Sequence, residues 1–232
     1  MNSLSTTRVA QTLQQLFAEA EQADRALMAQ FQDVDTAGPQ LADVIADHFA
    51  GEQRDVRGFY HGYVDNFLNV TQEYGQFLYQ CARAIKATRI VEFGTSMGIS
   101  TVYLAAALRD NGGGHLTGTE LEPSKAARAH ANLEVAGLAD IVDIRVGDAR
   151  QTLADLREEV DLVLLDGAFS LYLPVLKLLE PCLRTGAMIL AENAFDLENP
   201  YLDYVRNPAN GYLSQSIPIS PGRGNEFTIV TR

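Results

Sequence analysis

The sequence predicts an α/β fold: a doubly wound, mostly parallel sheet of seven strands, with a helical cap at the N-terminus and an antiparallel hairpin at the C-terminus. From Thr88 onward, five apolar runs alternate with helical patterns and are separated by short polar turns. Strands that are buried on both faces read as continuous apolar runs, and their alternation with helices indicates parallel βαβ units. The last two runs instead flank one tight turn, as in a hairpin.

The N-terminal part is predicted to be helical. Residues 5–31 carry apolar side chains at a helical period. A second, short helix is expected to begin at Pro39, because proline is tolerated in a first turn. Residues 51–63 are interpreted as loop and turn, and a longer helix is expected over residues 66–86.

The predicted strands follow in order along the rest of the chain. They are the segments RIVEF, HLTGTE, IVDIRV, VDLVLLD and AMILAEN, and then the hairpin strands YLSQSIPIS and NEFTIVTR, joined by PGRG. No internal repeat or low-complexity tract interrupts them. We therefore expect one domain over residues 1–232, with residues 1–65 as the cap and residues 66–232 as a cofactor-binding core.

Composition and charge argue against several function classes. The chain has 232 residues, of which 47% are hydrophobic, enough for one sizeable core. Its formal net charge of −12 repels phosphate backbones and anionic membranes, so neither nucleic acid nor a membrane is expected as a partner. The N-terminus shows no apolar signal segment, no apolar run has membrane-spanning length, and Cys81 and Cys182 have no metal-type spacing. These features predict a cytoplasmic protein with reduced thiols.

The stretch IVEFGTSMGIST, residues 90–101, joins the first predicted strand to a helix through a glycine turn. In an open parallel sheet, ligands bind beyond the carboxyl ends of the strands. A nucleoside triphosphate loop would need a lysine after its last glycine, and none follows Gly98. A dinucleotide loop would need glycine in place of Ser96, and Glu92 would repel its pyrophosphate. A cationic ligand without phosphate, such as S-adenosylmethionine, fits this combination, and Gly94 lets the chain turn sharply beside it.

Two further acids come at the ends of the next strands. Glu120 ends the second predicted strand, where a carboxylate can accept hydrogen bonds from both ribose hydroxyls. Asp148 follows the third strand, where it can contact the adenine amino group. The predicted cofactor-binding residues are Glu92, Gly94, Ser96, Ser100, Glu120, Asp148, Ala149 and Asp166. Each of these residues also has an interpretation without a ligand. The glycines can serve only in a turn or in packing, Glu120 as a solvated acid, and Asp148 only as a helix N-cap.

Together, the motifs VEFGTSMGIST, GTELEP, GDA, VDLVLLDGAFSLY and ILAEN resemble, in order and spacing, the class I S-adenosylmethionine-dependent methyltransferases. More narrowly, residues 70–232 resemble the small-molecule O-methyltransferases related to catechol and caffeoyl-CoA O-methyltransferase, and NGYLSQSIPI is part of that likeness. The resemblance implies a Rossmann-like fold, S-adenosylmethionine as cofactor, and methyl transfer to a hydroxyl of a small aromatic acceptor. It also implies a homodimer with the N-terminal helices at or near the interface.

The same resemblance implies a divalent cation, usually magnesium, between an acid after the fourth strand and an Asp-Asn pair after the fifth. The matching residues here are Asp166, Glu192 and Asn193, so glutamate replaces the usual aspartate. Carboxylates and an amide oxygen suit a hard cation, which would lower the pKa of the acceptor hydroxyl and align its oxygen with the methyl group. Asp166 is thus predicted to be a catalytic residue as well as a ligand. Without a metal, Asp166 would instead face the ammonium group of the cofactor.

One position departs from the family pattern. Members commonly carry a lysine three residues after the strand-four acid, and this chain has Phe169 there, which cannot accept a proton. His61, between Tyr60 and Tyr63, is by residue type the best substitute base, although a turn histidine with packed tyrosines is the commoner arrangement. The departure leaves other functions open: a metal-independent methyltransferase, a module that binds S-adenosylmethionine without catalysis, or a nicotinamide-dinucleotide enzyme.

Overall fold

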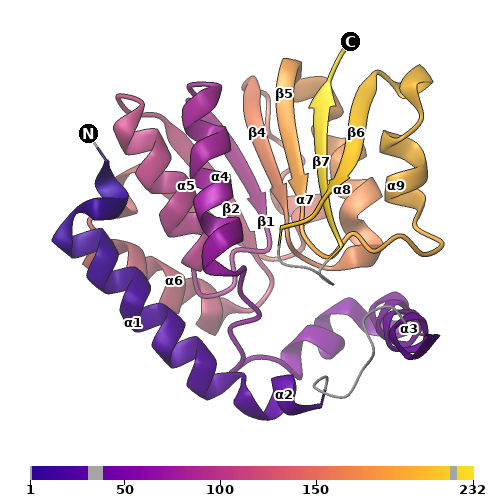
Figure 1. The fold of residues 1–232 in the computed structure, drawn as a ribbon, viewed down its shortest axis with the longest axis horizontal. Coiled ribbons are helices and arrows are strands. Elements are labelled where there is room, and N and C mark those ends of the chain that lie inside the picture. Colours follow the sequence, from indigo (N-terminus) through magenta and orange to yellow (C-terminus); the bar gives the residue numbers. More distant parts are fainter. Residues whose placement is uncertain (1, 31–38, 220–223) are drawn as a thin grey trace.

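The computed structural model describes residues 2–30, 39–219 and 224–232. In these parts of the chain, helices cover both faces of a seven-stranded sheet with the strand order β3-β2-β1-β4-β5-β7-β6 (Figure 1). The strands are β1 (Arg89–Phe93), β2 (His115–Glu120), β3 (Val142–Val146), β4 (Val160–Leu165), β5 (Leu183–Ala191), β6 (Tyr212–Ile217) and β7 (Asn225–Val230). The first five run parallel, whereas β7 is antiparallel to both β5 and β6. The predicted fold class is confirmed, including the terminal hairpin; of the turn predicted at PGRG, residues 221–224, all but Gly224 lie outside the described residues.

Strands β1 and β4 are largely apolar runs that are buried on both faces, as the continuous apolar pattern predicts, whereas β3 at the edge of the sheet is only partly covered. In β1, Ile90 packs into the core on one face of the sheet and Val91 into the core on the other. The chain order reverses between β1 and β4, because β2 and β3 extend the sheet to one side of β1 and β4 and β5 extend it to the other. Such a reversal opens a crevice beyond the carboxyl ends of the strands, where ligands bind in this kind of sheet.

The helices on the two faces belong to two separate cores. On one face lie α1 (Thr7–Ala23), α4 (Gln72–Ala84), α5 (Ile99–Asp110) and α6 (Pro123–Ala136). On the other lie α7 (Ala149–Thr152), α8 (Tyr172–Leu179) and α9 (Pro200–Val205). The remaining helices, α2 (Arg25–Ala29) and α3 (Pro39–His61), lie below the carboxyl ends of the parallel strands in the view of Figure 1. Among the described residues, no helix has the length and apolar character that a membrane span needs.

The N-terminal helices have two different roles in the packing. Helix α1 lies against α5 and α6 and buries Val9, Leu13, Leu16 and Ala20, so it is part of the outer layer of one core. Helix α3 instead packs on the short turn after β4. It is therefore α3, and not α1, that stands over the edge of the sheet where the site is predicted.

The loop predicted over residues 51–63 is wrong, because α3 continues to His61. The glycines of this segment favour a turn in the sequence pattern, and the helix does bend at Asp55, where φ is −161° and ψ is 91°. The carboxylate of Glu52, before this bend, accepts backbone hydrogen bonds from the turn after β4. This long-range contact ties α3 to the sheet, which the local preference for a turn does not reveal.

The helix predicted over residues 66–86 is shorter, since α4 begins only at Gln72. The carboxylate of Asp24 accepts the backbone N–H groups of Phe67 and Leu68, at 2.8 and 3.0 Å. Leu68 has a φ of 49°, in the left-handed region. These contacts hold the segment before α4 as a loop at the edge of the sheet.

Candidate functional site

A cavity of about 380 Å³ lies beyond the carboxyl ends of β1, β2 and β4, where the strand order reverses. Small-molecule sites typically have volumes of roughly 300–1,000 Å³. The cavity is lined by Gly94, Ser96, Glu120, Asp148, Ala149 and Asp166, which are all of the predicted cofactor-binding residues except Glu92 and Ser100. Tyr60 of α3 and Lys125 of α6 also line it.

The glycine loop after β1 needs glycine for a specific steric reason. Gly94 has a φ of 96°, and a Cβ atom placed on it would lie 2.2 Å from the carbonyl oxygen of Asp166. The loop after β1 therefore packs directly against the backbone after β4, which no larger residue at position 94 permits. Gly98, with a φ of 92°, packs its backbone against Ala129 of α6 in the same way.

Glu92 lies behind the glycine loop and not on the wall of the cavity. Its carboxylate is fully buried and accepts hydrogen bonds from the hydroxyls of Thr95, Ser100 and Thr101, at 3.0, 2.6 and 2.6 Å. Burial raises the pKa of this carboxyl group, although the three hydroxyls act in the opposite direction. Ser100 is thus oriented toward Glu92 and borders only a small adjoining hollow. Glu92 and Ser100 therefore connect the glycine loop to the start of α5. They can affect a ligand in the cavity only indirectly, through the position of that loop.

Glu120, at the end of β2, connects two loops at the cavity. One carboxylate oxygen accepts the backbone N–H of Ser96 at 2.7 Å, and the other accepts that of Glu122 at 2.9 Å. Burial raises the pKa of Glu120, partly offset by the N–H of Glu122 and the charge of Lys125. Lys125 is itself only 4% exposed, and its burial lowers its pKa. The sequence analysis did not identify Lys125, which lies in the first turn of α6. Its only signal in the sequence is that it follows closely after Glu120.

Asp148 is the helix N-cap that was considered for it, and it also lines the cavity. Its side chain caps α7 by accepting the backbone N–H of Arg150 at 2.9 Å. The guanidinium of Arg150 lies 2.6 Å from the same carboxylate, and this hydrogen-bonded pair lowers the pKa of Asp148. Asp148 is therefore held as an anion at the rim of the cavity.

The acids after β4 and β5 are brought side by side because the strand pairing continues past the strands. The backbone N–H of Asp166 donates to the carbonyl of Phe93 at 2.8 Å, and that of Glu192 donates to the carbonyl of Leu165 at 3.0 Å. Asp166 lines the cavity, whereas Glu192 is only 1% exposed. Asn193 follows with a φ of 56°, and its amide nitrogen lies 3.4 Å from a carboxylate oxygen of Glu192.

A buried hydroxyl faces this group. Burial raises the pKa of Tyr74 well above its usual value, and the charges of Glu192 and Asp166 add to the effect. In the described part of the chain, the Tyr74 hydroxyl has no hydrogen-bond partner. Within the same residues, no three His, Cys, Asp or Glu side chains are grouped so as to hold a metal ion. The metal ligands predicted from the sequence, Asp166, Glu192 and Asn193, are two carboxylates and one amide.

His61 does not line the cavity. Its side chain is 71% exposed, and its Nδ1 lies 3.3 Å from a carboxylate oxygen of Glu122. It ends α3 on the side of Glu122, and none of its described contacts is with Asp166. The neighbouring Tyr60 does line the cavity, so a residue of this segment other than His61 faces inward.

Phe169 lies at the centre of an aromatic cluster between α3 and the turn after β4. Its ring stacks on His48 with a centroid distance of 4.5 Å and meets Tyr172 and Phe195 edge-on at 6.0 and 6.1 Å. The residue that departs from the family pattern is therefore a packing element. The sequence reasoning missed His48 and Glu52, whose signal is their i, i+4 spacing on α3.

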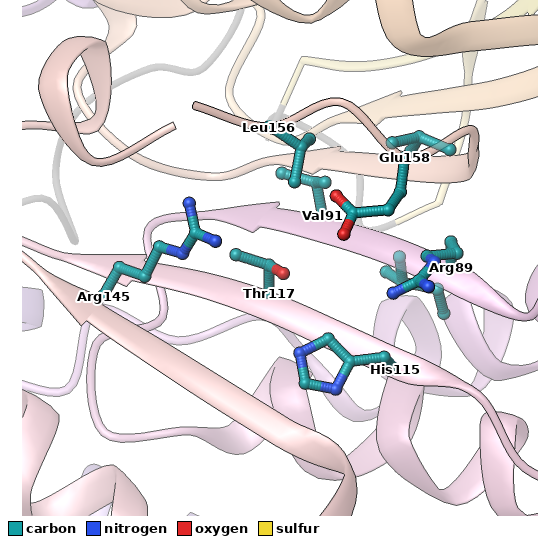
Figure 2. A pocket seen from close by; sticks show the side chains of 9 residues that line it. Arg89, Val91, His115, Thr117, Arg145, Leu156 and Glu158 are labelled. Carbon is teal, nitrogen blue, oxygen red and sulfur yellow. The ribbon is translucent and has the colours of Figure 1, made fainter. Parts of the chain in front are cut away.

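A second cavity, of about 250 Å³, lies against the amino ends of β1, β2 and β4 (Figure 2). Arg89, His115, Arg145 and Glu158 line it. Arg145 is paired with Asp143 and Asp155, at 3.3 and 2.7 Å. None of the predicted site residues lies in this cavity, which is at the other end of the strands from the glycine loop.

The chain is similar in sequence to known methyltransferases. A family model described as a methyltransferase domain matches residues 91–194, which span the loops from β1 to β5. The chain is 35% identical over 130 residues to catechol O-methyltransferase from Niastella koreensis, covering 54% of this chain and 58% of that protein. It is 31% identical over 147 residues to catechol O-methyltransferase from Sus scrofa, covering 60% of this chain and 78% of that protein. The chain spans a little over half the length of several curated relatives, such as the Niastella protein.

Solved structures with the same fold extend over nearly the whole chain. The cofactor-bound protein Rv0187 from MTB superimposes with a TM-score of 0.65 at 26% identity, covering 90% of this chain and 97% of that one. The O-methyltransferase TomG from Streptomyces achromogenes, solved in complex with SAM, has a TM-score of 0.66 at 22% identity, covering 92% and 99%. At that level of identity, the likeness to TomG supports the fold alone.

Proposed function

The chain belongs to the class I O-methyltransferase family of the catechol and caffeoyl-CoA type, and on that premise we propose that it transfers a methyl group from S-adenosylmethionine to a hydroxyl of a small aromatic molecule. The observation that carries the proposal is the hydrogen bond from the backbone N–H of Ser96 to Glu120. It connects the glycine loop to an acid at the end of β2, and both line one cavity with Asp166. S-adenosylmethionine is cationic and lacks phosphate, so the carboxylate of Asp166 beside the Gly94 loop favours it over the pyrophosphate of a dinucleotide.

The cofactor is proposed to lie along the ends of the strands. Glu120 would accept the ribose hydroxyls, and Asp148 with Ala149 would border the adenine. The Gly94 loop and Asp166 would border the methionine end. Asp166 then stands between the cofactor and α3, which is where the acceptor would enter.

The reaction is an in-line displacement at the methyl carbon. A lone pair of the acceptor oxygen forms the new C–O bond, and the C–S bond breaks with its electron pair returning to sulfur, so the sulfonium becomes a thioether. The acceptor hydroxyl loses its proton to solvent or to a base. Because no bond to the protein is made, most of the rate enhancement comes from alignment of the two reactants.

An aromatic acceptor is supported by the side of the site that α3 covers. Phe169, His48, Tyr172 and Phe195 form a cluster of rings there, and Tyr60 lines the adjoining cavity. Flat rings favour edge-on and stacked contacts with another aromatic molecule. With Phe169 at the usual lysine position, this wall binds an acceptor through its ring and offers it no cation.

A magnesium ion is the second part of the proposal. Asp166, Glu192 and Asn193 would hold it, because two carboxylates and an amide oxygen suit a hard cation. The unpartnered Tyr74 hydroxyl beside Glu192 and Asp166 is a polar group that a hydrated cation would satisfy. When bound, such an ion supplies Lewis-acid activation of the acceptor hydroxyl.

The test is direct. The protein is incubated with S-adenosylmethionine, magnesium and a panel of phenols that includes catechol and caffeate, and S-adenosylhomocysteine and methylated product are measured. Product formation with at least one phenol is expected, together with S-adenosylmethionine binding in calorimetry. Binding without any turnover would instead favour a module that has lost catalysis, and binding of NADH in place of S-adenosylmethionine would overturn the cofactor.

A further inference from the structure

Glu52 of α3 is a buried acid that neither the family pattern nor the proposed chemistry uses. It is 1% exposed, and its two carboxylate oxygens are fully engaged. The hydroxyl of Tyr60 donates to Oε1 at 2.7 Å, and the backbone N–H groups of Phe169 and Ser170 donate to Oε1 and Oε2, at 3.0 and 2.7 Å. The Nε2 of His48 lies 3.1 Å from Oε1. Burial alone would raise the pKa of Glu52, but hydrogen bonds from His48, Tyr60 and Ser170 lower it below its usual value.

This arrangement determines how Tyr60 can interact with a ligand. A phenol has one hydrogen, and that of Tyr60 is committed to Glu52. Burial and the charge of Glu52 raise the pKa of Tyr60 well above its usual value, so the hydroxyl stays protonated. Toward any further partner, including the Nε2 of His48 at 3.3 Å, the Tyr60 oxygen is therefore a hydrogen-bond acceptor. Its second lone pair is left for a ligand.

Tyr60 is also in the right place. It lines the cavity together with Asp166, and the charge of Asp166 is one of the causes of its raised pKa. Phe169, at the position where the family commonly has a lysine, presents no polar atom to an acceptor. Two α3 side chains that line the cavity, Asp55 and Tyr60, have an oxygen that can receive a hydroxyl hydrogen. The Asp55 carboxylate accepts the backbone N–H of Gly58 at 3.0 Å, whereas Tyr60 is subject to the charge of Asp166.

We propose that Tyr60 accepts a hydrogen bond from the acceptor hydroxyl, and that Glu52 is the positioning residue that orients Tyr60 for this contact. The inference rests on the proposed methyl transfer and assigns a specific contact within it. A hydroxyl whose hydrogen points to Tyr60 has its lone pairs free to face the methyl group. The same carboxylate anchors the backbone of Phe169, so one residue sets both the polar and the apolar side of the acceptor site.

The experiment compares Tyr60→Phe, Glu52→Gln and the double variant, with Tyr63→Phe as the matched control. Tyr63 packs its ring against Phe59 and Tyr60 but does not line the cavity. The acceptor is whichever phenol of the panel gives the highest turnover with the wild-type protein. For each variant, kcat and KM for the phenol, calorimetric affinity for S-adenosylmethionine, and Tm are measured.

Loss of one hydrogen bond to a substrate lowers kcat/KM by about tenfold. We expect that loss in Tyr60→Phe and in Glu52→Gln, with S-adenosylmethionine affinity within about twofold of wild type and Tyr63→Phe unaffected. Because Glu52 acts through the Tyr60 hydroxyl, the kcat/KM of the double variant should be no lower than that of the less active single variant. Multiplied losses in the double variant would make Glu52 a structural anchor only.

The outcomes separate the two proposals. A wild-type protein that methylates no phenol of the panel would overturn the proposed function and this inference with it. An active wild-type protein whose Tyr60→Phe variant keeps kcat/KM within about twofold would overturn the inference alone. If Glu52→Gln fails to fold, Tyr60→Phe still decides, since it removes one oxygen atom and keeps the ring that packs against α3.

Discussion

The carboxylate of Glu120, at the end of β2, accepts a hydrogen bond at 2.7 Å from the backbone N–H of Ser96, in the loop that follows β1. Ser96 has a φ of 46°, an uncommon conformation for a residue other than glycine. The acid therefore helps to hold the loop in a conformation that the chain alone disfavours. The same side chain lines the cavity, so the shape of the loop and the binding of a ligand depend on one residue.

Glu120→Gln is expected to weaken S-adenosylmethionine binding and leave the fold intact. The amide keeps one accepting oxygen, but its nitrogen would face a backbone N–H and cannot accept from a ribose hydroxyl. Loss of a charge-assisted hydrogen bond costs about 1.5–3 kcal/mol, or roughly ten- to a hundredfold in affinity. Calorimetry measures the change, with Glu158→Gln in the second cavity as control. Unchanged affinity in Glu120→Gln would remove this residue from the site.

Gly94→Ala should be more damaging than Gly112→Ala. Both glycines have a positive φ, 96° and 104°, so both alanines carry the left-handed strain of about 1–2 kcal/mol. Only at Gly94 does the new Cβ also collide with the backbone of Asp166, because nothing lies within 4 Å at Gly112. We expect Gly94→Ala to lower the Tm further than Gly112→Ala does, and only Gly94→Ala to lose S-adenosylmethionine binding. Equal effects would show that the close approach to Asp166 relaxes without cost.

The proposed magnesium site predicts a metal requirement. EDTA should abolish methyl transfer, magnesium should restore it, and Asn193→Ala should raise the magnesium concentration that gives half-maximal activity. The physical reason is that a cation relieves the repulsion between the Asp166 and Glu192 carboxylates and fixes the acceptor oxygen. Full activity in excess EDTA, with Asn193→Ala unaffected, would overturn the metal site.

The buried Glu92 carboxyl predicts a pH-dependent difference in stability. Burial raises its folded-state pKa above 4.5, so between pH 4.5 and that raised pKa the folded protein binds more protons than the unfolded one. The stability that this group contributes therefore falls as the pH rises through that window. The free energy of unfolding of Glu92→Gln, minus that of wild type, should increase from pH 4.5 upward and then level off. Urea unfolding at a series of pH values measures it, and a constant difference would contradict the raised pKa.

Leu16→Ala should destabilise the whole domain, because α1 is packed into the core. Leu16 is 2% exposed in the cluster that also contains residues of α4 and α5. Replacement of a buried leucine by alanine costs about 2–5 kcal/mol in the free energy of unfolding. Gln14→Ala, on the exposed face of the same helix, is the control. If chemical denaturation shows no loss for Leu16→Ala, α1 would be a detachable element, and removal of residues 1–31 would spare the core.

The sequence by itself determined the sheet and the edge on which the site lies. The central strands β1 and β4 are largely apolar runs, and burial of such runs against helices leaves few other arrangements. Because parallel strands end at one edge, Glu120, Asp148 and Asp166 had to come together there, and the register after β4 and β5 likewise brings Glu192 beside Asp166. Those inferences depended on local patterns and on strand order alone.

Only the tertiary structure decided which side chains face the ligand and how α3 is placed. Glu92 reads as a site acid but turns inward to three hydroxyls, because its strand position faces the buried start of α5. Glu52 and Phe169 are 117 residues apart, and no local pattern relates a buried acid on a helix to two backbone N–H groups after a distant strand. That contact ties α3 to the turn after β4, and in the folded chain Tyr60, instead of His61, lines the cavity. Long-range hydrogen bonds to a buried carboxylate form only once the chain is folded, so their partners cannot be inferred from spacing.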